Sequence, residues 1–256
     1  MRPSFIVSSA FVGLVMLAAI AECKSGNLKQ KYYRKSCPSA ERTVRDITWS
    51  KVAANPGLAA ILLRLQYHDC FVRIITEKKC HGVVSCADIV ALATRDAVSY
   101  QFKLPKWEVL TGRRDGRVSL ASEASRDMPS PNADFNTLLD QFGSKGLDII
   151  DLVTLSGAHT IGKTRCTQLV TRRLYNFTGK GDADPSLDPE YAETLRATCP
   201  NPPNPTILIE MDPGSSHSFD SHYYMTLNQI KIRKMGAIGV LTNGQGEIRR
   251  NCRLVN

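Results

Sequence analysis

The run from Leu58 to Phe71 constrains the fold of this chain more than any other segment. Alanine, leucine and isoleucine dominate it, and that composition favours a helix. Residues four positions apart share one face of a helix, so Arg64 and His68 are expected to point the same way. A fixed cation beside an imidazole can stabilise an oxyanion while the imidazole moves a proton, so this face is a candidate for acid–base chemistry.

A second histidine segment, Leu155–Gly162, follows the apolar stretch Ile149–Leu155. The apolar lead-in predicts that His159 lies near the interior. A buried imidazole is a good axial ligand for haem iron, which makes His159 a candidate cofactor ligand. The remaining histidines have no comparable motif and are expected at the surface: His81, His217 and His222.

Helix signals recur along the chain and predict one mainly α-helical domain with few or no short strands. Pro38 introduces a helix over Ala40–Ala54. Ser85, with Asp88 three residues later, predicts a capped start for a helix that ends near Ser99.

Further elements are expected beyond this region. Asp148 can cap the short helix that leads to His159, whereas the proline-rich segment 176–221 should be mostly loop. The other expected elements are an amphipathic helix over Phe135–Phe142, a helix over Thr164–Tyr175, a turn of helix near Glu190–Ala197, a helix over Ser221–Met235 and a short strand pair within Lys103–Gly116.

The first 21 residues have the pattern of a secretory signal peptide, with an early Arg2, an apolar run and a small-residue cleavage signal ending at Ala21. A membrane anchor is the less favoured alternative, because the apolar run is short. Eight cysteines in a secreted chain indicate disulfides rather than a metal site. Cys23 can leave with the leader, and the mature cysteine count would then be odd.

A formal net charge of +9 indicates attraction to polyanions. The basic residues are scattered rather than clustered in a stripe, so no nucleic-acid partner is expected. Acidic cell-wall polysaccharide is the more natural partner of a secreted basic chain. The sequon Asn176-Phe177-Thr178 is a candidate N-glycosylation site.

Several motifs occur in the order found in one family. They lie at Tyr33–Glu41, Leu63–Arg73 (LRLQYHDCFVR), Gly82–Asp96 (GVVSCADIVALATRD), Gly112–Asp115 (GRRD), Leu155–Gly162 (LSGAHTIG), Phe219–Tyr224 (FDSHYY) and Gly246–Cys252 (GEIRRNC). This series resembles the secreted plant (class III) haem peroxidases. The resemblance covers nearly all of the chain after the leader. It implies that residues 22–256 form one haem peroxidase domain and that the protein is monomeric and lies outside the cell or in the cell wall.

The resemblance implies a haem b cofactor whose proximal iron ligand is His159. Arg64 and His68 would then face the open side of the haem and cleave hydrogen peroxide, and phenolic donors would supply single electrons. Pro129 matches the edge where substrates enter. Tyr67 stands where the family usually has phenylalanine, and it adds an oxidisable hydroxyl.

The resemblance also implies calcium sites and disulfides. Asp69 and the Val72 carbonyl match part of the distal calcium site, and the proximal site is matched by Thr160, Asp212, Ser215, Ser218 and Asp220. The implied disulfides are Cys37–Cys80, Cys86–Cys252 and Cys166–Cys199, which leaves Cys70 unpaired.

The chain departs from the family at two places, after Arg73 and after Lys231, where internal segments are missing. The first gap removes most distal calcium ligands, the asparagine that orients the distal histidine and the partner of Cys70. The second gap removes helices that cover the haem pocket and the aspartate that hydrogen-bonds the proximal histidine.

An alternative function follows from these gaps: a catalytically impaired, haem-poor secreted protein that binds the cell wall. Two other classes are poorly supported. A cysteine protease using Cys70 and His159 lacks an oxyanion hole, and a zinc hydrolase lacks the HExxH spacing.

Overall fold

The computed structural model describes residues 28–71, 82–118, 120–166, 169–185, 187 and 189–220. This part of the chain is mainly α-helical, as the sequence predicts. The expected leader and the expected helix over 221–235 lie outside the described residues.

The described elements follow one another in a simple order. They are η1 (Tyr32–Arg34), α2 (Ala40–Ala54), α3 (Leu58–Phe71), α4 (Cys86–Ser99), η2 (Tyr100–Phe102), α5 (Ala121–Asp127), α6 (Phe135–Gly143), α7 (Ile149–Ser156), η3 (Gly157–Thr160), β1 (Lys163–Arg165), α8 (Leu169–Tyr175), α9 (Pro189–Thr198) and β2 (Leu208–Glu210).

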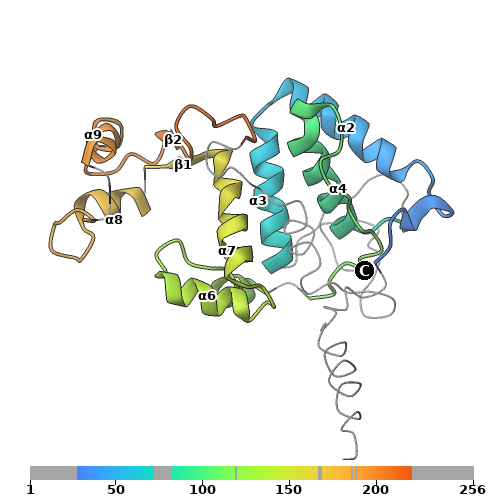
Figure 1. Ribbon diagram of the computed structural model, residues 1–256, viewed down its shortest axis with the longest axis horizontal. Helices are drawn as coiled ribbons and strands as arrows, with labels where there is room; N and C mark the ends of the chain where they lie inside the picture. The colour runs from blue at the N-terminus through green and yellow to red at the C-terminus, as the bar shows by residue number, and fades with distance from the viewer. Residues whose placement is uncertain are drawn as a thin grey trace, which may run out of the picture.

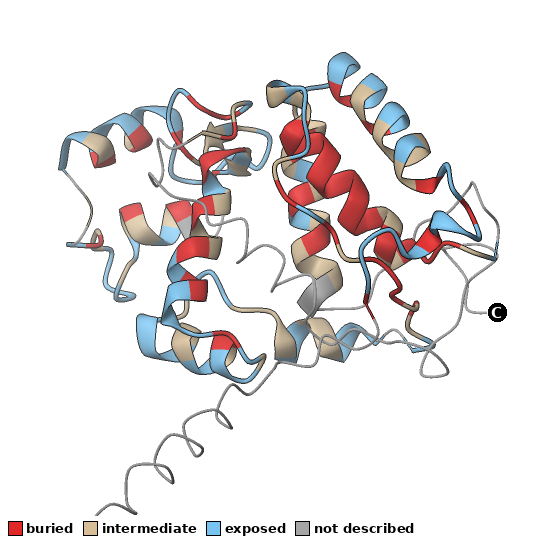
Figure 2. Cartoon of the chain, turned by 45° about the vertical axis from the view of Figure 1, so that its right-hand side comes forward, coloured by how far each residue is buried: buried red, intermediate tan, exposed pale blue. Residues whose placement is uncertain are grey.

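Helix α4 forms the centre of the larger group of helices. It packs against α2 and α3 (Figure 1), and almost all of its residues are buried (Figure 2). Leu92 and Val98 of α4 share the main apolar cluster with Leu63 of α3 and Val52 of α2. The Thr94 hydroxyl also donates to the Leu62 carbonyl, 3.0 Å away, and so ties α4 to α3. These contacts fix the helix that carries Arg64 and His68.

Local capping signals place the helix starts where the sequence predicts them. The Ser85 side chain accepts a hydrogen bond from the Asp88 N–H and caps α4. At α7 the Asp148 side chain accepts from the Asp151 N–H, and the Asp151 side chain accepts from the Asp148 N–H in return. This reciprocal pair satisfies N–H groups that a helix start otherwise leaves without a partner.

A second, smaller cluster joins α8 and α9. It contains Val170, Leu174 and Leu195 together with the disulfide Cys166–Cys199, whose predicted pairing is confirmed. Figure 1 shows these two helices apart from the α2–α4 group. Cys37 and Cys86 are also disulfide-bonded. Their predicted partners, Cys80 and Cys252, and the side chain of Cys70 lie outside the described residues.

Two expectations about local structure are wrong. The residues after His159 do not begin a helix at Thr164, because Lys163–Arg165 forms strand β1 and pairs antiparallel with β2. The part of residues 103–116 that the structure describes contains no strand: Thr111 forms an antiparallel bridge with Lys29, and Arg114 and Asp115 are bridge residues outside any named strand. Helix α5 has no counterpart among the expected elements, and none of its residues is buried.

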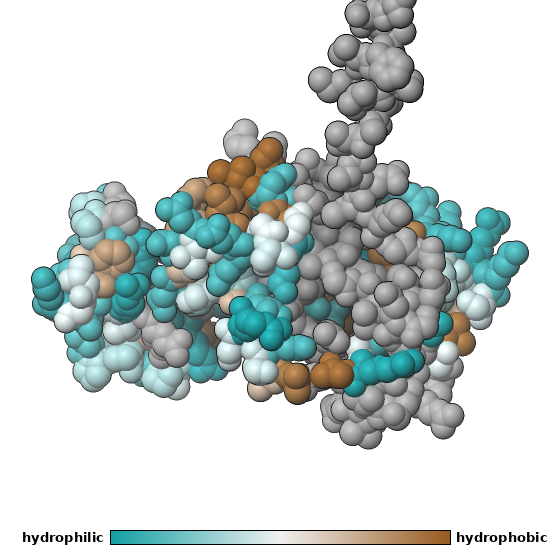
Figure 3. Space-filling model, turned by 90° about the horizontal axis from the view of Figure 1, so that it is seen from below, coloured by the Kyte–Doolittle hydropathy of each residue, from teal (hydrophilic) through white to brown (hydrophobic). Residues whose placement is uncertain are grey.

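Helix α7 leaves apolar side chains in contact with solvent. Ile149, Ile150 and Val153 are all exposed, as is Phe135 of α6. The view from below shows brown, apolar patches on the otherwise largely teal described surface (Figure 3). Apolar side chains exposed together on one helix can mark a surface that contacts another element or molecule.

Candidate active site

Arg64 and His68 lie on one face of α3, as their spacing predicts. The Arg64 Nε–H donates to His68 Nε2 over 3.2 Å. Arg64 is exposed and His68 is half-buried. Because Arg64 donates to Nε2, that nitrogen carries the lone pair, and the neutral imidazole holds its proton on Nδ1.

The surroundings of His68 favour its neutral form. Burial lowers the pKa of His68 below its usual value, and the positive charge of Arg64 lowers it further. A neutral imidazole beside a permanent cation can accept a proton at Nε2 while the guanidinium stabilises negative charge nearby. This pair is therefore equipped for heterolytic bond cleavage.

Tyr67 lies beside His68 and connects α3 to other elements. Its ring meets the His68 ring edge-on, with centroids 5.9 Å apart. It also packs against the apolar cluster of Phe142, Leu147 and Leu152, which comes from α6, the following turn and α7. Burial raises the pKa of Tyr67 to about 12, so its hydroxyl keeps its proton at neutral pH.

His159 is exposed, so the expectation that it lies near the interior is wrong. It belongs to the 3-10 turn η3, where Gly157 and Thr160 are the buried residues. Thr160 takes the inward position and is fully buried, which leaves the intervening imidazole on the outer side of the turn. The apolar stretch before it is helical, and only part of that helix faces the core.

The tautomer of His159 follows from its hydrogen bond. Its Nδ1 lies 2.8 Å from the Ser156 carbonyl oxygen. A carbonyl only accepts, so Nδ1 must donate, and the lone pair of the neutral imidazole lies on Nε2. An imidazole nitrogen of this kind suits haem iron, so the donor set fits the cofactor that the sequence implies.

The turn that bears His159 packs close to α3. Gly162 has φ 108°, and a Cβ there would lie 3.1 Å from the Ala60 Cβ. A glycine is needed at this position both for the backbone conformation and for the close approach. Leu155 and Ala158 pack against the same core cluster as Ala60. The structure thus brings the two histidine-bearing elements together, with His159 near the start of α3 and His68 near its end.

The residues of the expected proximal calcium site form one connected cluster. The Thr160 hydroxyl donates to Asp220 Oδ1 at 3.1 Å and lies 3.3 Å from Asp212 Oδ2. The Ser215 hydroxyl lies 2.6 Å from Asp220 Oδ2 and 3.2 Å from the Ser218 carbonyl oxygen. Carboxylate, hydroxyl and carbonyl oxygens gathered in this way suit Ca²⁺.

The positions of the other predicted site residues say little about which ligands they could bind. Asp69 is half-buried near the end of α3, whereas Val72 lies outside the described residues. Pro129 is half-buried and directly follows Met128, which packs with Tyr67 against the α6–α7 cluster. His217 is exposed, as expected, and His81 and His222 lie outside the described residues.

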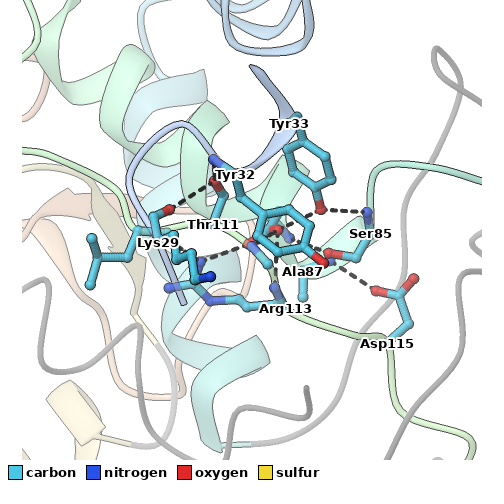
Figure 4. A network of polar contacts seen from close by, with 11 residues as sticks. Lys29, Tyr32, Tyr33, Ser85, Ala87, Thr111, Arg113 and Asp115 are labelled. Carbon is cyan, nitrogen blue, oxygen red and sulfur yellow. Dashed lines mark hydrogen bonds and ion pairs between the residues drawn. The ribbon is translucent and has the colours of Figure 1, made fainter. Parts of the chain in front are cut away.

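A buried polar network around Asp88 was not anticipated from the sequence (Figure 4). The fully buried Asp88 carboxylate accepts from the Tyr33 hydroxyl at 2.6 Å, the Gly112 N–H at 2.6 Å and Arg113 Nη1 at 2.8 Å. Asp115 accepts from the Cys86 and Ala87 N–H groups at the start of α4. The motif Gly112–Asp115 therefore anchors α4 and the segment before α2, and through α4 it supports α3.

Comparison with known proteins agrees with these features. The model of the family described as Peroxidase matches residues 72–246. Peroxidase 24 of Arabidopsis thaliana is 43% identical over 308 residues, which cover 90% of this chain and 88% of that relative. Peroxidase 39 of the same plant is 37% identical over 96% of this chain and 98% of its own length, and Peroxidase 1 of Oryza sativa subsp. japonica is 36% identical over 97% and 99%.

The chain belongs to the peroxidase family, and the named relatives place it among the plant (class III) peroxidases. Membership of this family supports peroxidase activity, and a peroxidase is an oxidoreductase. The aligned stretch with Peroxidase 24 has 308 positions, more than the 256 residues of this chain, so that relative carries residues without a counterpart here. No helix within the described ranges is long and apolar enough to cross a membrane.

Proposed function

We propose that this chain is a haem-dependent peroxidase that reduces hydrogen peroxide and oxidises phenolic donors. The observation that carries the proposal is the hydrogen bond between Arg64 Nε and His68 Nε2 on α3, in a chain of the peroxidase family. His159 would hold haem b through Nε2, with the Ser156 carbonyl fixing the orientation of its ring.

Two side chains, His68 and Arg64, would act on peroxide as it is cleaved. Haem, when bound, supplies the iron that binds peroxide and stores the oxidising equivalents. His68 Nε2 accepts the proton of the incoming peroxide and returns it to the departing oxygen. The Arg64 guanidinium leaves its hydrogen bond to His68 and stabilises the negative charge that develops as the oxygen–oxygen bond breaks.

Turnover of the haem-loaded protein tests this function. We expect peroxide to be consumed in the presence of a simple phenol and the phenol to be oxidised in proportion. The same chain without haemin is the control and should be inactive. A haem-loaded protein that consumes no peroxide would contradict the proposal. A chain that takes up no haemin would favour the haem-poor, wall-binding alternative, which the exposed position of His159 also supports.

We propose that the cluster of Thr160, Asp212, Ser215, Ser218 and Asp220 binds one calcium ion. Two carboxylates supply most of the charge, and Thr160 links the cluster directly to His159 in the chain. Bound calcium would therefore steady the turn that carries the proposed iron ligand. The matching distal site lacks most of its ligands, so we expect no calcium there.

Calcium should stabilise the wild-type chain and fail to stabilise Asp220→Asn. At a calcium concentration about 100 times Kd, the free energy of unfolding should rise by about 2.7 kcal/mol. The measurement is urea unfolding with calcium and with a chelator. The matched control is Asp140→Asn, an exposed carboxylate of α6 that should respond like the wild type. Equal stabilisation of Asp220→Asn would rule out this site.

We further propose that the chain is secreted as a monomer after loss of residues 1–21 and glycosylated at Asn176. Asn176 is exposed at the end of α8, which leaves it accessible to the glycosylating enzyme. Expression in plant cells should deliver the protein to the medium with a mass that falls on N-glycosidase treatment. An unchanged mass would show that the sequon is not used. The net charge of +9 supports attraction to acidic wall polysaccharide.

We propose, finally, that the extra residues of the relatives correspond to gaps after Arg73 and after Lys231. The exposed Ile149, Ile150 and Val153 of α7 support the second gap, because covering helices would otherwise bury them.

A further inference from the structure

We propose that Tyr67 is a redox-active residue that donates one electron to the peroxide-oxidised active site and is then reduced by the phenolic donor. This inference rests on the proposed haem peroxidase function. It assigns a role to a side chain that peroxide cleavage by Arg64 and His68 does not use.

The position of Tyr67 supports this role. It adjoins His68 in the chain, and the two ring centroids are 5.9 Å apart, so an oxidant formed beside His68 is formed close to a phenol. The Tyr67 ring also packs against Leu152 and the cluster that joins α6 to α7. Helix α7 runs directly into the turn that carries His159. Tyr67 therefore contacts, from the helix that carries His68, the helix that leads to His159.

The surroundings of Tyr67 also connect it to the expected entry point of substrates. Met128 packs against the same cluster as Tyr67 and directly precedes Pro129, the residue that matches the substrate edge. The Tyr67 side chain is only half-buried, so water reaches part of it. An oxidisable group that connects the site of oxidation to the donor edge is well placed to relay single electrons.

The electrons and protons of the proposed step balance. Reduction of one hydrogen peroxide leaves two oxidising equivalents in the active site. The Tyr67 hydroxyl gives one electron to that site and its proton to water, so that its O–H bond breaks and a neutral phenoxyl radical forms. An external phenol then returns one electron and one proton to Tyr67 and becomes a phenoxyl radical itself.

Electron paramagnetic resonance of the haem-loaded protein tests this step. One equivalent of hydrogen peroxide is added without a donor and the sample is frozen at once. The wild type should show an organic radical signal that narrows when the tyrosines carry ring deuterium. Tyr67→Phe keeps the ring in the apolar cluster and removes the hydroxyl, so we expect its Soret band to remain and its tyrosyl signal to vanish.

The matched control is Tyr100→Phe, a half-buried tyrosine in η2 at the end of α4, which should keep the signal. An undiminished signal in Tyr67→Phe would overturn the inference, as would a wild type that turns over peroxide and shows no tyrosyl radical. Neither result would contradict the proposed peroxidase function. A wild type without a Soret band would overturn that function and this inference with it.

Discussion

Replacing His68 with leucine is expected to lower kcat/KM for hydrogen peroxide by a factor of about 10²–10⁴, the usual contribution of a general acid–base. The imidazole is the group that moves the proton between the two peroxide oxygens, and leucine fills similar space without a proton acceptor. Steady-state kinetics at saturating phenol measure the change. The haem content should not change, because the proposed iron ligand lies on η3 and not on α3.

The control for this variant is His217→Leu, which removes an exposed histidine that belongs neither to the peroxide site nor to the calcium ligands and should leave the rate unchanged. Arg64→Ala is expected to lower kcat/KM by a factor of about 10²–10³, because one stabilising donor is lost. If His68→Leu kept the wild-type rate with an intact Soret band, α3 would not carry the peroxide site.

Replacing Asp88 with asparagine is expected to lower the free energy of unfolding by about 3–5 kcal/mol, because it leaves a buried charge without its partner. Arg113 is only 7% exposed, and its Nη1 donates to Asp88 over 2.8 Å. The same carboxylate accepts from the Tyr33 hydroxyl and the Gly112 N–H, and an amide cannot satisfy all these donors. Urea unfolding at neutral pH measures the loss.

Asp46→Asn is the matched control for Asp88→Asn. It breaks the ion pair between Arg45 Nε and Asp46 Oδ1, which are 3.5 Å apart; Asp46 is exposed and Arg45 is half-buried. Such surface pairs contribute at most about 1 kcal/mol. If both variants lost the same small amount, the network of Figure 4 would not anchor α4 as we infer.

The sequence predicts those features that depend on neighbouring residues. Ser85 and Asp148 cap the helices they were expected to cap, and the four-residue spacing of Arg64 and His68 produces the hydrogen bond between them. Such signals act within one or two turns of helix, so they need no knowledge of the rest of the fold. The family motifs add Cys166–Cys199, a pair that spacing alone would not choose.

The sequence fails where distant segments decide the outcome. Thr164 lies in a strand because Ile209 pairs with it from 45 residues away, which local helix signals do not register. In the sequence, Asp88 is an ordinary residue near a helix start. Only the fold brings Tyr33 and Arg113 within hydrogen-bonding distance of it. His159 follows an apolar run, yet it is exposed because Thr160 takes the inward position of the turn.

The most direct test of the proposed site is an absorption titration of the purified chain with haemin. We predict a Soret band that saturates at one haem per chain in the wild type and in His217→Ala, and no such band in His159→Ala. A wild type that stays colourless, or a His159→Ala variant that develops the same band, would contradict the assignment of His159 as the iron ligand.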